Sequence, residues 1–243
     1  MTTEEGIFQR ARLLLGDSVM RTLADRKVII FGTGGVGSWC AEGLVRNGIG
    51  HLTLVDPDRV CLSNVNRQLM ATTATVGQVK VEVLRERLLQ INPEAHIEAR
   101  QEAYTAETAD SFALDDYDYV IDAIDSLSDK QLLILRATRC RHTKLFSSMG
   151  AAFKMDPARI RVAEFWKVVG DPLARALRNR FKRSEQFPAR KFLCVYSDEP
   201  PGLLTPQPVS EQEGRGSLVH VTAVFGFMLA SLVVRDICER DGR

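Results

Sequence analysis

Short apolar runs alternate with amphipathic stretches through the first 150 residues. The runs that predict strands occupy residues 28–31, 52–55, 96–100, 119–122 and 144–147. Helical spacing of apolar residues predicts helices near 78–91, 106–112 and 127–141. Because strands and helices alternate, we expect a Rossmann-like α/β fold, with a doubly wound, mostly parallel sheet and helices on both faces.

The chain before the first strand predicts a helix over residues 6–24. Its apolar positions are expected to form one face of this helix, and they are Leu13, Leu14, Val19 and Leu23. The sequence thus predicts a helical segment that leads into the sheet.

Beyond residue 150 the pattern becomes irregular. A strand near 159–165 and a basic amphipathic helix at 172–183 precede residues 184–216, whose Pro, Gly and Ser residues predict long loops with short strands. We expect this stretch to face the substrate as a lid. We assign residues 1–150, including the N-terminal helix, to an α/β core. Residues 151–243 are assigned to a C-terminal region that completes the same domain.

A long apolar run occupies residues 218–234. It contains His220 and Gly226 and is short for a membrane span. A helix that is buried in the core or lies at a dimer interface is therefore favoured over a membrane anchor.

Glycines separate the first strand from the helix that follows it, namely Gly32, Gly34, Gly35 and Gly37. Gly32 permits a tight turn, Gly34 allows a phosphate to approach the backbone, and Gly37 lets the helix pack against the strand. Asp56 ends the second strand, where an acid commonly accepts hydrogen bonds from ribose hydroxyls. The pattern predicts a nucleotide site, with an ordinary turn between strand and helix as the alternative.

Composition adds few limits. The 243 residues carry a formal net charge of +1, so any nucleic-acid surface must be local rather than a property of the bulk charge. The five cysteines are scattered, without a C-x-x-C pair. We therefore expect no zinc site and no disulfide framework, and we expect a reducing cytoplasmic location. Residues 1–26 lack the pattern of a signal peptide.

Three polar motifs follow the glycine loop: DPDRVCLSNVNRQ from Asp56, then VGQVK, then VIDAIDS. Arg67 and Lys80 are natural partners for phosphate groups. Asn64 and Gln68 offer uncharged hydrogen bonds to ribose or phosphate. Asp125 lies just beyond a strand end and supplies a hard oxygen ligand for Mg²⁺. Each of these residues alone has a solvated loop side chain as its alternative.

In this order the motifs resemble the ubiquitin-activating-enzyme-like (ThiF-type) adenylyltransferase family, over roughly residues 10–150. The resemblance implies that ATP is used to adenylate a carboxylate. It implies that Asp56 binds the ribose, Arg67 and Lys80 bind phosphates, and Asp125 binds Mg²⁺. Asp58 is a further candidate.

The same resemblance implies a homodimer in which an arginine from the N-terminal helix reaches the γ-phosphate in the partner subunit. Arg10 and Arg12 both precede Gly16. The spacing to Gly16 favours Arg10, and Arg12 remains the alternative. Either residue is otherwise a surface charge of the helix.

The second half of the chain resembles one branch of this family, the tRNA threonylcarbamoyladenosine dehydratases. The resemblance is carried by SMGAAFKMDPARI, DPLARALR, VYSDEP and GSLVHVTAVFGF. It implies that the threonyl carboxylate of the modified base attacks ATP, and that the neighbouring carbamoyl group then expels AMP, with net loss of water. The alternatives are an activator of a sulfur-carrier protein, a non-catalytic nucleotide-sensing module and an NAD dehydrogenase.

This branch implies tRNA as the partner, and the basic helix is the predicted contact. Its candidate residues are Arg175, Arg178, Lys182 and Arg183. A solvated amphipathic helix is the alternative. The resemblance also leaves room for a monovalent cation and for a sulfur-transfer protein partner. Cys194 is the candidate for a sulfur-carrying or thioester-forming cysteine. The alternative is that it is a small buried side chain.

Overall fold

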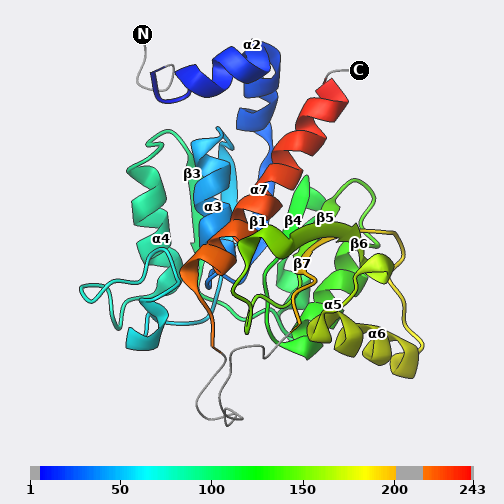
Figure 1. Ribbon diagram of the computed structural model, residues 1–243. Coiled ribbons are helices and arrows are strands. Elements are labelled where there is room, and N and C mark those ends of the chain that lie inside the picture. Colours follow the sequence, from blue (N-terminus) through cyan, green and yellow to red (C-terminus); the bar gives the residue numbers. More distant parts are fainter. Residues whose placement is uncertain (1–5, 201–215, 242–243) are drawn as a thin grey trace.

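The computed structural model describes residues 6–200 and 216–241 (Figure 1). Within these residues the strands form one sheet of order β3-β2-β1-β4-β5-β7-β6. The strands are β1 (Lys27–Phe31), β2 (His51–Val55), β3 (His96–Arg100), β4 (Tyr119–Asp122), β5 (Lys144–Ser148), β6 (Ile160–Glu164) and β7 (Leu193–Ser197). All neighbours are parallel except β6 and β7, so the predicted Rossmann-like α/β fold is confirmed.

Helices cover both faces of the sheet (Figure 1). They are α2 (Gln9–Asp25), α3 (Gly37–Arg46), α4 (Lys80–Leu89), α5 (Leu127–Ala137), α6 (Pro172–Ser184) and α7 (Val219–Asp241). One apolar core lies between the sheet and α2, α3, α4 and α7, and a second lies between the sheet and α5 and α6. The single sheet includes strands from both halves of the chain.

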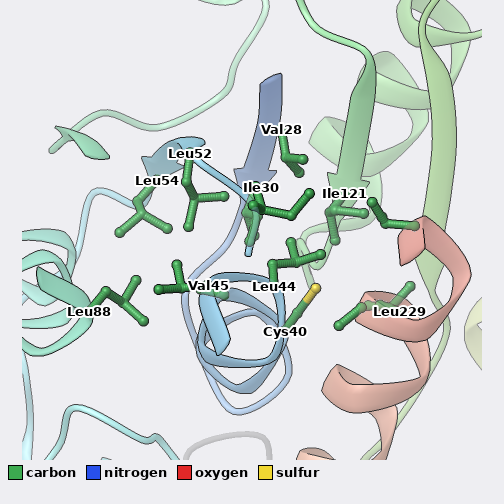
Figure 2. Packing of buried hydrophobic residues seen from close by; sticks show 14 of the residues in the cluster. Val28, Ile30, Cys40, Leu44, Val45, Leu52, Leu54, Leu88, Ile121 and Leu229 are labelled. Carbon is green, nitrogen blue, oxygen red and sulfur yellow. The ribbon is translucent and has the colours of Figure 1, made fainter. Parts of the chain in front are cut away.

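Strand β1 shows why the chain builds two cores. Val28 and Ile30 point into the first core, and Ile29 and Phe31 point into the second. Successive side chains of a strand face opposite sides, so a strand buried on both faces is continuously apolar. Figure 2 shows the first core, where Leu44 of α3 and residues of β1, β2 and β4 come together.

Helix α7 contains the apolar run and crosses α3 at glycines. A Cβ on Gly226 would lie 2.5 Å from the Val36 carbonyl oxygen, and one on Gly43 would lie 3.0 Å from Ala230. By length and composition residues 219–240 would also span a membrane, but half of the most apolar window is buried inside the fold. The contact with α3 agrees with the predicted buried helix.

Several boundaries differ from the sequence prediction. Only a 3₁₀ turn, η2 (Ala109–Ser111), forms in the predicted helix 106–112, and α5 ends at Ala137 rather than at residue 141. Residues 184–216 were predicted as long loops with short strands, and one strand, β7, forms there and lies inside the sheet between β5 and β6. Residues 201–215 of the predicted lid lie outside the described residues.

Helix α2 also departs from the prediction. Leu23 is buried, but Leu13 and Leu14 are 76% and 83% exposed. The helix is kinked at Gly16, where φ is 79°. Because the kink reorients the first turns, Leu13 and Leu14 do not join the face that packs on the core.

We predict that Gly226→Ala lowers the free energy of unfolding by about 2 kcal/mol, because the added methyl group collides with backbone atoms of α3. Urea denaturation measures the change. Ser231→Ala, at a half-buried position on the same helix, serves as the control and is expected to cost less than about 1 kcal/mol. Equal stability of the two variants would contradict the proposed close packing.

Candidate nucleotide-binding site

A cavity of about 470 Å³ opens at the carboxyl ends of β1, β2, β4 and β5. The chain continues from β1 toward β2 on one side and from β4 toward β5 on the other, so this is the point where the strand order reverses. Ligands of open α/β sheets bind in such crevices. The predicted residues at its wall are Gly32, Gly34, Gly35, Asp56, Asp58, Asn64, Arg67, Gln68, Lys80 and Asp125.

The glycines have two different functions in the loop. A Cβ on Gly37 would lie 1.8 Å from the Gly32 carbonyl oxygen, and one on Gly32 would lie 2.6 Å from that of Ala123. Gly32 also has a φ of 87°, which side chains rarely adopt. By contrast, the nearest atom to a Cβ on Gly34 is 3.7 Å away, on Gln68. Gly32 and Gly37 are therefore needed by the packing, while Gly34 leaves room for a ligand.

Asp56 holds the glycine loop to the loop after β2. Its Oδ2 accepts a hydrogen bond from the Thr33 backbone N–H at 2.7 Å, and its Oδ1 accepts one from the Asp58 N–H at 3.0 Å. Lys80 is buried beside them, with its Nζ 2.8 Å from Asp58 Oδ2 and 4.0 Å from Asp56 Oδ1. The structure thus brings together a buried ammonium group and two carboxylates at the wall of the cavity.

Another part of the wall comes from the segment at 61–68. Asn64 is buried, and its Oδ1 accepts a hydrogen bond from the Cys61 N–H at 3.0 Å, so this side chain also shapes the loop. Arg67 donates to the Ser63 carbonyl at 2.7 Å but remains half-exposed. The Gln68 Oε1 is buried without a hydrogen-bond partner among the described residues. These two side chains are available to a ligand.

Asp125 lies on the loop after β4, and a buried ion pair fixes that loop. Lys130 and Asp122 are fully buried and 2.8 Å apart. Lys130 Nζ also donates to the Ile124 carbonyl at 3.0 Å, and Ser147 donates to Asp122 at 2.6 Å. The loop is therefore held rigidly, while the Asp125 side chain is exposed toward the cavity.

This buried pair was not predicted from the sequence. Lys130 shares a helix face with Leu133, Ile134 and Ala137, all of which are buried. A lysine on an apolar helix face requires a buried acidic or hydrogen-bonding partner, so its position alone indicated that such a partner exists. The partner itself, at the end of β4, was not identifiable from spacing.

Tyr104 is a second residue that sequence reasoning missed. It lines the cavity and is 4% exposed, and its ring contacts Phe31 edge to face and Phe112 at a tilted angle. Its hydroxyl has no hydrogen-bond partner among the described residues. Burial raises the pKa of this hydroxyl, so it stays protonated and can donate to a ligand. No motif in the sequence pointed to it.

The N-terminal arginines lie far from this cavity. Helix α2 leads into the amino end of β1, whereas the cavity is at the carboxyl ends of the strands (Figure 1). Arg12 is 3.5 Å from Asp17. Arg10 is exposed and forms no ion pair within the described part of the chain. Arg10 is therefore the freer of the two candidates, and it does not line this cavity.

The predicted RNA-binding residues differ in their availability. Arg178 donates to the backbone carbonyls of Phe165 at 3.2 Å and Val168 at 3.0 Å, so its guanidinium is used inside the protein. The other three candidates are exposed and unpaired within residues 6–200 and 216–241, and they are Arg175, Lys182 and Arg183. We therefore remove Arg178 from the set of candidate RNA contacts.

Cys194 is a structural residue. It lies in β7 and is fully buried. Burial raises the pKa of its thiol well above the ordinary value, so the reactive thiolate is disfavoured. The structure therefore supports the alternative interpretation, in which Cys194 is a small buried side chain.

The arrangement suits a nucleoside triphosphate. Lys80, Arg67 and the open backbone at Gly34 can neutralise and approach phosphate oxygens. Asp125 offers an exposed carboxylate, and the described residues contain no group of three potential metal ligands. One carboxylate together with phosphate oxygens is the usual way to hold Mg²⁺, so the residues present fit this ion.

Comparisons with known proteins agree with this geometry. The model of the ThiF family matches residues 8–242. A tRNA threonylcarbamoyladenosine dehydratase of Haemophilus influenzae is 36% identical over 94% of this chain and 92% of its own length. The solved structure of the Escherichia coli tRNA N6-threonylcarbamoyladenosine dehydratase with ATP has a TM-score of 0.88 and 35% identity, and covers 98% of this chain and 96% of that one. The molybdopterin-synthase adenylyltransferase of E. coli is 36% identical but matches only 65% of this chain and 61% of its own.

We predict that adding a methyl group at two positions of the glycine loop affects two different properties, stability and ATP binding. Gly37→Ala is expected to lower the melting temperature by several degrees, because its Cβ collides with the Gly32 carbonyl. Gly34→Ala should leave the melting temperature unchanged but weaken ATP binding measured by calorimetry. Intact ATP affinity in Gly34→Ala would contradict a phosphate position at this residue.

Proposed function

Because this chain belongs to the ThiF family, we propose that it uses ATP to dehydrate threonylcarbamoyladenosine in tRNA. The observation that carries the proposal is the end-to-end match to named dehydratases, which includes the second half of the chain. The sulfur-carrier alternative has less support, since the match to the adenylyltransferase of molybdopterin synthase covers only part of the chain.

The proposed reaction has two steps. An oxygen of the threonyl carboxylate attacks the α-phosphorus of ATP, and pyrophosphate leaves. A nucleophilic atom of the carbamoyl group then attacks the activated carbonyl carbon, loses its proton and expels AMP. The base loses one water, while ATP becomes AMP and pyrophosphate. Because the second step is intramolecular, it needs no covalent cysteine, in agreement with the buried Cys194.

We assign the site residues from their positions at the cavity. Lys80 and Arg67 bind and orient the phosphates, and they offset the repulsion between the attacking carboxylate and ATP. We assign Asp56 to accept a hydrogen bond from a ribose hydroxyl, in addition to those it accepts from the Thr33 and Asp58 N–H groups. Asp125 would hold Mg²⁺, whose charge would stabilise the leaving pyrophosphate.

We propose that the enzyme is a homodimer with Arg10 acting on the ATP of the partner subunit. Two observations support this. Arg10 is exposed at the opposite end of the sheet from its own cavity, and Leu13 and Leu14 beside it form an exposed apolar pair. A second copy of the chain would cover these leucines and supply the arginine.

We also propose a cytoplasmic location. A reducing cytoplasm suits the proposed substrate and the five free cysteines.

The first test of the function is direct. Purified protein with ATP, Mg²⁺ and tRNA carrying threonylcarbamoyladenosine should give a nucleoside that is lighter by one water. Lys80→Ala should lower kcat by about 100-fold or more, because the phosphates lose a buried cation. Lys27→Ala, an exposed lysine at the start of β1, is the control and should retain full activity. No ATP-dependent mass change in the unaltered protein would refute the proposal.

Mixing two inactive variants tests the shared site. Arg10→Ala and Lys80→Ala should each be inactive. A mixed dimer contains one complete site, formed by Lys80 of the first subunit and Arg10 from the second. Random exchange of subunits should therefore restore about a quarter of the unaltered activity. If mixing restores nothing while mixed dimers form, Arg10 does not act on the partner's site.

A further inference from the structure

Two aromatic rings are exposed next to the basic helix. Trp166 lies in η5 (Phe165–Lys167), just before α6, and Phe187 lies just after α6. Their ring centroids are 6.3 Å apart, and the residues are 41% and 51% exposed. The adjacent Phe165 is fully buried and fills the core. The core therefore leaves this pair of large rings in water, where they contribute little to folding.

The protein holds Trp166 in a fixed position. Its backbone N–H donates to the Glu164 carboxylate at 3.2 Å. Arg178 binds the carbonyls of Phe165 and Val168, on either side of it. Below the ring, the buried Phe181 of α6 lies 6.5 Å away between centroids. The ring is thus presented at the surface by rigid neighbours, which lowers the entropy cost of binding a planar ligand.

The segment that contains Phe187 is rich in positive charge. Residues 172–191 contain seven lysines and arginines and a single acid, Glu185. Of these, Arg178, Arg180 and Arg190 donate hydrogen bonds to other residues of the protein. The exposed cations without a partner in the described part of the chain are Arg175, Lys182, Arg183 and Lys191. Lys167 follows Trp166 directly and is also exposed.

Unpaired cations next to exposed aromatic rings have the chemistry that binds single-stranded nucleic acid. Aromatic side chains stack on unpaired bases, and nearby cations contact the phosphates. A protein partner of ordinary composition would not require this excess of cations. The charge therefore favours an anionic ligand with planar groups.

The geometry places this surface within reach of the nucleotide cavity. Leu173, in the first turn of α6, lines the cavity. Helix α6 has 13 residues and so extends about 20 Å from the cavity toward Lys182 and Arg183. A strand of RNA with one base in the cavity can therefore reach these cations along the helix.

We propose that Trp166 and Phe187 stack on an unpaired nucleobase of the tRNA loop that carries the modified adenosine, while Lys182 and Arg183 contact its phosphates. This proposal rests on the proposed function, because it requires an RNA substrate. It adds a contact that uses stacking as well as charge. The two kinds of contact respond differently to salt, and this makes them separable.

The test uses a labelled RNA hairpin with the loop sequence of the substrate, titrated at several salt concentrations. Trp166→Ala should weaken binding about tenfold and leave the slope of log K against log salt unchanged, since no charge is lost. Trp166→Phe should keep most of the affinity. Lys182→Gln should weaken binding and lower the slope by about 0.7, the value for one phosphate contact of a single strand.

Turnover provides a second measurement. Trp166→Ala should raise KM for tRNA, with kcat and KM for ATP unchanged, because the ring lies outside the reaction site. Phe187→Leu should have a smaller effect in the same direction. A folding defect would instead lower the fraction of active protein and reduce kcat. The melting temperature of each variant is measured to identify such a defect.

The outcomes are distinct. If the unaltered protein modifies tRNA and Trp166→Ala binds the hairpin equally well, the stacking proposal is wrong and the proposed function stands. If the unaltered protein neither binds nor modifies tRNA, both are wrong. If Trp166→Ala changes the oligomeric state, the pair belongs to a protein interface and the proposal is overturned.

Discussion

The close approach of the glycine loop to the loop after β4 is the constraint on which the site depends. Gly37 lies against the carbonyl of Gly32, and Gly32 lies against that of Ala123, so neither glycine position has room for a Cβ. This contact puts the start of α3 beside the end of β4, at the point where the strand order reverses. The cavity exists because these two backbones meet without side chains between them.

Buried charges then make the loops rigid. Asp122 and Lys130 are removed from water, which is costly unless the charges are paired and their remaining hydrogen bonds are made. Here Ser147 and the Ile124 carbonyl complete the pair. Asp56 uses its carboxylate in a similar way on the glycine loop. Groups that will face ATP are therefore positioned before it binds, and little reorganisation is needed during the reaction.

The sequence predicted most strands and the glycine loop because their signals are local. Alternating apolar runs and close-packed glycines depend on neighbours along the chain, and the match at β3 and β4 follows from that. The apolar face predicted for helix α2 was wrong at Leu13 and Leu14, which are exposed because the kink at Gly16 breaks the periodicity. Strand β7 was expected only as an unbounded short strand among long loops, because its burial comes from β5 and β6, which are distant in sequence.

The candidate site divides in the same way. Its charged residues follow strand ends in motifs, so Asp56, Lys80 and Asp125 were predictable as a group. Lys130 and Tyr104 depend on partners supplied by other elements, and no spacing reveals them. The role of Arg178 was also hidden, because a basic helix does not show which cations turn inward.

Asp171 connects the cavity to the proposed RNA surface. Its Oδ1 accepts a hydrogen bond from the Ala174 N–H at 2.8 Å and so caps α6, while its Oδ2 accepts one from the Gly150 N–H at 3.0 Å at the cavity wall. Burial raises the pKa of this carboxyl group above its usual value, although the backbone donors act in the opposite direction. A single buried side chain thus ties the start of the basic helix to the loop where the modified base is expected to lie. RNA held along α6 would therefore be oriented relative to ATP by the fold itself, without a separate positioning element.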